Sequence, residues 1–298
     1  MPTATMRGVF PILVTPFDEH GQIDEDSLRN LVEFNLGAGV HGLGVALGSE
    51  IFKLSEAERE HVTRIVVDQV RRRVPVVINS GAAGTDLAGH YSRTAERNGA
   101  DALMIIPPSF LPAGPGEVRE YYRTISDAVG IPIFIQDTPA APVSASLARQ
   151  IAEECRWVRY IKVETLPITS RVADMVAQAG DQLVVFGGAG GGYFIEELRR
   201  GSQGTMPFCS QPEAFVEVWN LYRSGNERAA RAVFDRVIAP INRIAAQGAG
   251  IFYHVHKELL RRRGIIRTAK VRSPAPPVDE LTERELQQVI DELYLAAG

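Results

Sequence analysis

Residues 75–106 read PVVINSGAAGTDLAGHYSRTAERNGADALMII, and they contain one full repeat of the pattern that runs through the chain. The runs at 75–79 and 102–106 are short, apolar and bounded by glycine, proline or polar turns, which predicts strands. The stretch between them, at 86–98, has the apolar period of an amphipathic helix. A strand, a helix and a strand in this order predict a βαβ unit with parallel strands.

The same alternation extends in both directions from this unit. Further strands are predicted at 9–15, 42–47, 132–136, 158–163 and 183–187, with a weak one at 205–208. Further helices are predicted at 28–39, from Ser55 onward with Glu58 completing a capping box, and at 117–129, 145–154, 168–179 and 191–200. Eight such units fit a closed (β/α)8 TIM barrel of the α/β class better than an open sheet.

After the eighth strand the alternation stops and helices follow one another. They are predicted at 213–224, 226–246 and 250–263, and a proline-rich joint at 273–279 leads to a last helix with a capping box of Thr282 and Glu285. We therefore divide the chain into a barrel at 1–224 and a C-terminal helical region at 225–298.

Composition excludes several classes of protein. The 298 residues are 45% hydrophobic and 23% charged, which excludes a disordered or collagen-like chain. The net charge of −4 and the pI near 5.9 give no general attraction to nucleic acid or anionic lipid. No apolar run reaches the length of about 18 residues that a membrane span needs, and residues 1–7 lack the apolar run of a signal peptide. We expect a cytoplasmic protein without nucleic-acid or membrane partners.

The residue most indicative of chemistry is Lys162, because it interrupts the apolar strand RYIKVET. Sites of such barrels lie at the C-terminal ends of the strands. Side chains alternate along a strand, so Tyr160, Lys162 and Glu164 share one face. A lysine withdrawn from water loses its proton more easily, and the amine can then attack a carbonyl. The alternative is a structural ion pair, or a lysine whose stem packs while its tip reaches water.

Polar residues at other strand ends are weaker candidates. Gly48 and Ser49 form a tight turn whose backbone N–H groups could bind a carboxylate, unless it is an ordinary turn with Glu50 in solvent or capping. Gln136 and Asp137 could hydrogen-bond a polyol or act as acid and base, unless Asp137 only organises its turn. Ser109 follows the fourth strand and could line the site.

Two further motifs carry less functional information. The run GGAGGG at 187–192 fits neither the dinucleotide fingerprint nor the P-loop, so its glycines, Gly188 among them, more simply let the backbone approach the barrel mouth. His254 and His256 lie two apart on a helix and do not face each other, which makes them a poor metal pair. We predict no metal site.

Taken together, these motifs resemble the dihydrodipicolinate synthase / N-acetylneuraminate lyase family, whose members are Schiff-base-forming (β/α)8 barrels with a helical appendix. The resemblance is carried by GVFPILVTPFDEHGQID, PVVINSGAAGT, ADALMIIPPSF, IPIFIQDTP and YIKVET. It implies that Lys162 forms the Schiff base and that the substrate is a small 2-keto acid. It also implies that no cofactor is needed beyond the covalent imine, and that the chain forms a homo-oligomer, a tetramer or a dimer.

Departures from the family pattern indicate which subgroup of the superfamily the chain resembles. The usual G-T-T-G-E is ALGSE at 46–50, and the tyrosines that relay protons are replaced at Gln136 and at the Pro108-Ser109 pair. The arginine that binds the synthase's second substrate falls at Ala141. The remaining motifs resemble the 2-keto-3-deoxy-arabonate dehydratases of the same superfamily.

The resemblance leads to a specific expectation, which is the dehydration or aldol cleavage of a 2-keto-3-deoxy sugar acid. Lys162, Glu164 and Gln136 are then the catalytic residues. The expected substrate-binding residues are Gly48, Ser49, Ser109, Asp137, Gly188 and Met206. Three alternatives stay open: 4-hydroxy-tetrahydrodipicolinate synthase, a pyruvate-dependent aldolase of the N-acetylneuraminate or keto-deoxy-gluconate type, and a non-catalytic keto-acid-binding protein.

Overall fold

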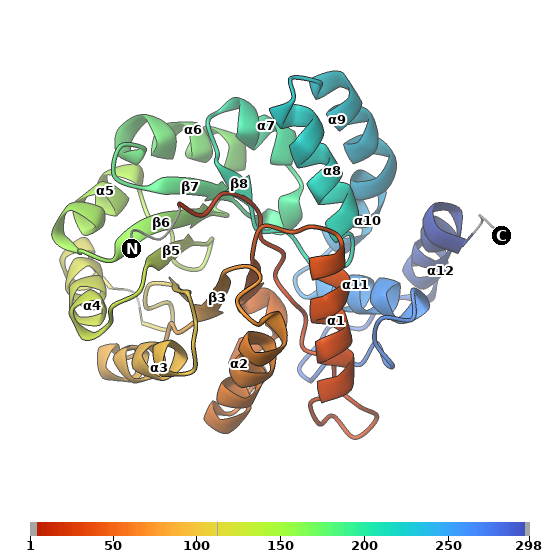
Figure 1. The fold of residues 1–298 in the computed structure, drawn as a ribbon, viewed down its shortest axis with the longest axis horizontal. Coiled ribbons are helices and arrows are strands. Elements are labelled where there is room, and N and C mark those ends of the chain that lie inside the picture. Colours follow the sequence, from red (N-terminus) through yellow and green to blue (C-terminus); the bar gives the residue numbers. More distant parts are fainter. Residues whose placement is uncertain (1–4, 112, 296–298) are drawn as a thin grey trace.

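The computed structural model describes residues 5–111 and 113–295, so the expectation for residues 1–7 lies partly outside it. Within this range eight parallel strands alternate with helices, as predicted (Figure 1). The strands are β1 (Gly8–Val9), β2 (Leu43–Val45), β3 (Val76–Asn79), β4 (Ala102–Ile105), β5 (Ile133–Asp137), β6 (Val158–Val163), β7 (Val184–Gly187) and β8 (Gly204–Thr205). The helices that follow them are α1 (Glu25–Gly37), α2 (Glu56–Val70), α3 (Thr85–Arg97), α4 (Pro115–Ala128), α5 (Ala145–Glu154), α6 (Ile168–Ala179), α7 (Phe194–Arg199) and α8 (Pro212–Arg223).

The first predicted strand is where expectation and structure differ most. The hydrogen-bonded ladder runs in the order β1-β8-β7-β6-β5-β4-β3-β2, and β1 has only two residues instead of seven. Its extension nevertheless contacts both neighbours, because Ile12 forms parallel bridges with Gly44 and with Phe208. This bridge between the first and second strand runs brings the ends of the sheet together, and the (β/α)8 architecture is confirmed.

Alternation along the strands separates two apolar layers. One layer fills the barrel interior and includes Phe134, Tyr160, Phe186 and Met206. The other lies between strands and helices and includes Ile161 and Val163. Because Lys162 follows Tyr160 at an inward position of β6, the fold places its amine above the aromatic floor of the barrel.

Of the two capping boxes predicted from the sequence, the one near the N-terminus forms and the one near the C-terminus does not. Ser55 and Glu58 form the predicted capping box of α2. At α12 (Glu280–Ile290) the prediction of Thr282 as the cap is wrong, because Asp279 accepts the N–H groups of Leu281 and Thr282. A carboxylate three residues upstream therefore starts this helix one turn earlier.

The C-terminal helices gather at one side of the barrel, drawn in blue in Figure 1. The predicted helix at 226–246 is α9 (Glu227–Val233), a π-helical turn at Phe234–Ile238, and α10 (Ala239–Ala245). Pro240 has no N–H to donate to the preceding turn, which accounts for the irregular hydrogen bonding. After α11 (Ile251–Arg262), residues 264–279 lead to α12. Among the described residues, no helix is both long enough and apolar enough to cross a membrane.

Candidate active site

A cavity of about 620 Å³ opens at the C-terminal ends of the strands. Gln136, Lys162 and Glu164 line its strand side, and α10 and α11 contribute Asn242, Arg243, Phe252 and His256 to its wall. The cavity therefore lies between the barrel and the C-terminal helices, at the position where this fold carries its sites.

The centre of the site is an ion pair between neighbouring positions on one strand face. Lys162 Nζ lies 2.9 Å from Glu164 Oε1, and their side chains are 6% and 17% exposed. Gln136 Nε2 donates to Glu164 Oε2 at 2.9 Å, and the backbone N–H of Ala189 donates to Oε1 at 3.0 Å. Two donors hold this carboxylate against the amine, so the two groups can exchange a proton without moving. The predicted catalytic trio is brought together.

The glycine-rich turn after β7 makes this arrangement possible. A Cβ added at Gly188 would overlap Cγ of Glu164, so no larger residue fits beside the carboxylate. This close approach of the backbone is what the sequence predicted for the run at 187–192.

The turn at Gly48 and Ser49 is built differently from the expectation. Leu47 and Gly48 line the cavity, but the Ser49 hydroxyl donates to the carbonyl of Leu13 and accepts from the backbone N–H of Ala46 at 3.0 Å. Ser49 is 1% exposed. The hydroxyl therefore holds the turn together, and Ser49 itself does not line the cavity.

Two other predicted substrate-binding residues lie away from the cavity, and one lies in it. Asp137 follows Gln136 and so points outward, where it accepts hydrogen bonds from the Val143 N–H at 2.8 Å and the Thr165 hydroxyl at 2.7 Å. It organises the loop after β5, which was the alternative considered. Ser109 is exposed on the loop after β4, whereas Met206 lines the cavity.

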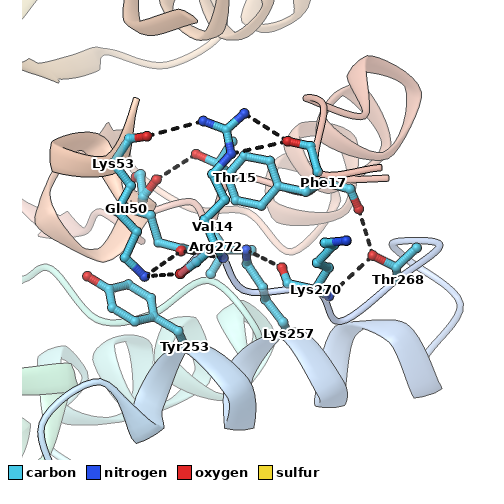
Figure 2. Close-up of polar contacts among 12 residues, drawn as sticks. Val14, Thr15, Phe17, Glu50, Lys53, Tyr253, Lys257, Thr268, Lys270 and Arg272 are labelled. Carbon is cyan, nitrogen blue, oxygen red and sulfur yellow. Dashed lines mark hydrogen bonds and ion pairs between the residues drawn. The ribbon is translucent and has the colours of Figure 1, made fainter. Parts of the chain in front are cut away.

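A buried ionic cluster beside the site was not predicted (Figure 2). Glu50 is fully buried in a left-handed conformation (φ 56°), so the alternative that placed it in solvent is wrong. Its carboxylate contacts Nζ of Lys257 at 2.5 Å and Nζ of Lys53 at 2.9 Å, and it accepts the backbone N–H of Arg272 at 3.1 Å. Burial lowers the pKa of Lys257 to about 8. The cluster fixes α11, and with it one wall of the cavity, to the loop after β2.

A second buried acid, Glu197 of α7, also escaped the sequence analysis. Its side chain packs so closely against Gly187 that a Cβ there would overlap Oε2. Neither carboxyl oxygen has a hydrogen-bond partner among the described residues. Burial, and secondarily the nearby Glu164, raise the pKa of Glu197 to about 8. The sequence of α7 gave no sign of this acid, because Glu196 and Glu197 are adjacent and only the folded structure shows that Glu197 is the buried one.

A model of the dihydrodipicolinate synthetase family matches residues 5–293, and the chain belongs to this family. The protein is thus a lyase of the class that forms a covalent Schiff base between a lysine and its substrate and needs no cofactor. Among residues 5–111 and 113–295, no cluster of three His, Cys, Asp or Glu side chains could hold a metal ion.

The individual relatives are named for different reactions. The chain is 29% identical over 291 residues to the L-2-keto-3-deoxyarabonate dehydratase of Azospirillum brasilense, covering 95% of this chain and 93% of that protein. It is equally 29% identical to the 4-hydroxy-tetrahydrodipicolinate synthase of Syntrophobacter fumaroxidans, covering 95% and 97%. The crystal structure of dihydrodipicolinate synthase from Thermotoga maritima superposes with a TM-score of 0.90 at 26% identity, covering 98% of this chain and all of that one.

Proposed function

We propose that this lyase dehydrates a 2-keto-3-deoxy acid of the sugar-acid type, with Lys162 as the amine that forms the imine. The observation that carries the proposal is the contact of 2.9 Å between a buried lysine amine and a carboxylate at the mouth of a (β/α)8 barrel. A buried amine beside an acid/base group is the arrangement that Schiff-base chemistry requires. The name of the Azospirillum brasilense relative supports the type of reaction.

The proposed reaction begins with the transfer of the ammonium proton from Lys162 to Glu164. The free amine attacks the C2 ketone, and loss of water gives an iminium ion. Because the iminium withdraws electrons, a base can remove a proton from C3, and the enamine that forms expels the C4 hydroxyl as water. Hydrolysis of the imine then releases the product and regenerates Lys162.

Glu164 is the group we assign to proton transfer at C3 and C4. Gln136 keeps its carboxylate oriented through the contact of 2.9 Å, in place of the tyrosine relay of the synthases. We assign the substrate carboxylate to the turn at Leu47 and Gly48, because both residues line the same cavity as Lys162.

The test is borohydride trapping of pyruvate or a 2-keto-3-deoxy acid, read by mass spectrometry of the intact protein. The unmodified enzyme should gain the mass of one reduced adduct, and Lys162→Ala should gain none. Glu164→Gln should still be trapped while its turnover falls about 10²–10⁴-fold, since general acid–base catalysis contributes that much. Trapping by the Lys162→Ala variant would show that another amine reacts.

The synthase reaction is the second candidate, because a relative with that name is also 29% identical to the chain. Against it, Ala141 occupies the position of the arginine that binds the second substrate, and Gln136 replaces a relay tyrosine. Assays with pyruvate and aspartate semialdehyde would detect condensation, whereas release of pyruvate from a 2-keto-3-deoxy acid would indicate an aldolase. Trapping without turnover of any keto acid would support a binding protein.

A further inference from the structure

One charged side chain in the wall of the cavity has no role in the reaction described above. Arg243 of α10 is an exposed residue that lines the same cavity as Lys162 and Glu164. Within the described part of the chain, its guanidinium group forms neither an ion pair nor a hydrogen bond. A guanidinium group keeps its charge in proteins, and it presents several donors in a planar fork. This group is therefore available to bind an anion.

The periodicity of α10 directs Arg243 toward the cavity. Ala239, Asn242, Arg243 and Ala246 all line the cavity, and their spacing of i, i+3, i+4 and i+7 defines one face of the helix. A helical side chain leans toward the N-terminus of its helix, so the stem of Arg243 lies over the turn that contains Ala239. Because alanine is small, the long and unpaired arginine side chain has room to move on this face.

The same face of α10 is tied to the loop that holds the catalytic carboxylate. Nδ2 of Asn242 donates to the carbonyl of Gly190 at 3.0 Å, and the N–H of Ala189 donates to Oε1 of Glu164 at 3.0 Å. Arg243 therefore belongs to the helical wall of the cavity, whereas the imine-forming lysine belongs to its strand side. A cavity of about 620 Å³ is in the range of sites that bind ligands much larger than pyruvate. A substrate attached to the lysine has space to extend toward α10.

The charges of the cavity wall favour an anion at this end. Lys162, Glu164 and Arg243 are the charged side chains among the described residues that line the cavity, and the first two form an ion pair at 2.9 Å. Burial lowers the pKa of His256 to about 3, so its ring adds no charge. The positive charge of Arg243 is thus uncompensated, although the whole chain has a net charge of −4. The 1-carboxylate of the substrate is assigned to the turn after β2, which leaves Arg243 for a second anionic group.

From this geometry we infer that Arg243 is a specificity-determining residue, whose guanidinium group binds a second anionic group at the distal end of the keto acid. The inference rests on the proposed function and defines its substrate class. The substrates are 2-keto-3-deoxy acids whose last carbon carries an anionic group, a carboxylate or a phosphate ester, in place of a neutral hydroxymethyl group. A carboxylate matches one guanidinium fork, whereas a phosphate ester carries nearly two negative charges. The terminal carboxylate is therefore the better fit to a wall with one such cation.

The test compares 2-keto-3-deoxy acids of the same carbon chain that end in a hydroxymethyl group, a carboxylate or a phosphorylated hydroxymethyl group. For the unmodified enzyme, kcat/KM should favour the carboxylate over the hydroxymethyl group about 10-fold, because hydrogen bonds between charged groups are stronger than neutral ones. This preference should shrink as ionic strength rises, since Arg243 is exposed.

Two substitutions separate the charge of Arg243 from its geometry. Arg243→Met keeps an unbranched stem without the charge, so the preference for a terminal anion should disappear. Arg243→Lys keeps the charge without the fork and should retain part of the preference. A higher kcat/KM for the phosphate ester than for the carboxylate, lost in Arg243→Met, would support the distal anion site and identify the phosphate ester as its ligand.

Pyruvate has no second anionic group, so it separates this inference from the proposed function. Arg243→Met should still trap pyruvate with borohydride, and Arg228→Met, which removes an exposed arginine of α9 outside the cavity, should change neither measurement. Equal kcat/KM for the charged and neutral acids overturns the inference, as does a preference that survives in Arg243→Met. Loss of pyruvate trapping in Arg243→Met also overturns it, because the arginine would then bind the 1-carboxylate. Failure of the unmodified enzyme to trap pyruvate overturns the proposed function and this inference with it.

Discussion

At the scale of single residues, the buried acid Glu197, which has no role in the proposed reaction, leads to a prediction about how folding stability depends on pH. Glu197 has a pKa of about 8 in the folded protein, against an ordinary value of 4.5. Below pH 4.5 the carboxyl is protonated in both states. Between pH 4.5 and 8 only the unfolded chain loses this proton. The contribution of the Glu197 carboxyl to folding stability therefore declines as the pH rises, by up to about 1.4 kcal/mol per pH unit.

Glu197→Gln removes this titration and should flatten the pH profile of the unfolding free energy between pH 5 and 8. Urea denaturation at several pH values measures this unfolding free energy. Glu196→Gln serves as the control, because Glu196 pairs with Arg231 and raises the pKa of Glu197 less than burial does, so most of the slope should stay in place. Parallel profiles for Glu197→Gln and the unmodified protein would mean that Glu197 is ionised in the folded state.

At the scale of elements, the turn after β7 links backbone geometry to catalysis. Gly188→Ala introduces a Cβ that overlaps Glu164, so the carboxylate must move away from the Lys162 amine. We expect turnover to fall about 10²-fold or more while pyruvate is still trapped, since the amine itself is untouched. Gly116→Ala in α4 is the matched control, because its Cβ would meet no atom within 4 Å. Unchanged turnover in Gly188→Ala would contradict the role of Glu164.

The secondary-structure elements also show which parts of the fold and of the site the sequence could predict. Apolar runs and helical periods located the strands and helices, and alternation along β6 placed Lys162 and Glu164 on one face. The same alternation sends Asp137 outward when Gln136 faces in, but the strand register needed to decide between them is not visible in IQDTP alone. Ser49 was misjudged for a similar reason, since only the folded turn shows that its hydroxyl bonds to the backbone.

At the scale of the whole molecule, the contacts that no local pattern could predict are those between distant segments. Glu50 and Lys257 are separated by 207 positions, and neither has a signal of burial in its own neighbourhood. The sequence marks His256 only as half of a poor metal pair, because its place in the cavity wall depends on how α11 docks against the barrel.

The Glu50–Lys257 pair makes the last prediction, which concerns how the barrel and the C-terminal helices are joined. Both side chains are fully buried, so Lys257→Met leaves the Glu50 carboxylate with only Lys53 and the Arg272 N–H as partners. Removing one member of a buried pair costs about 3–5 kcal/mol of unfolding free energy, measured by urea denaturation. The double variant Glu50→Gln/Lys257→Met should recover part of this loss, because the carboxylate is then neutral, although Lys53 keeps only a carbonyl partner. Lys257→Met should leave pyruvate trapping at Lys162 in place. Additive losses in the double variant would instead show that the two residues act independently and that the cluster does not clamp the helix to the barrel.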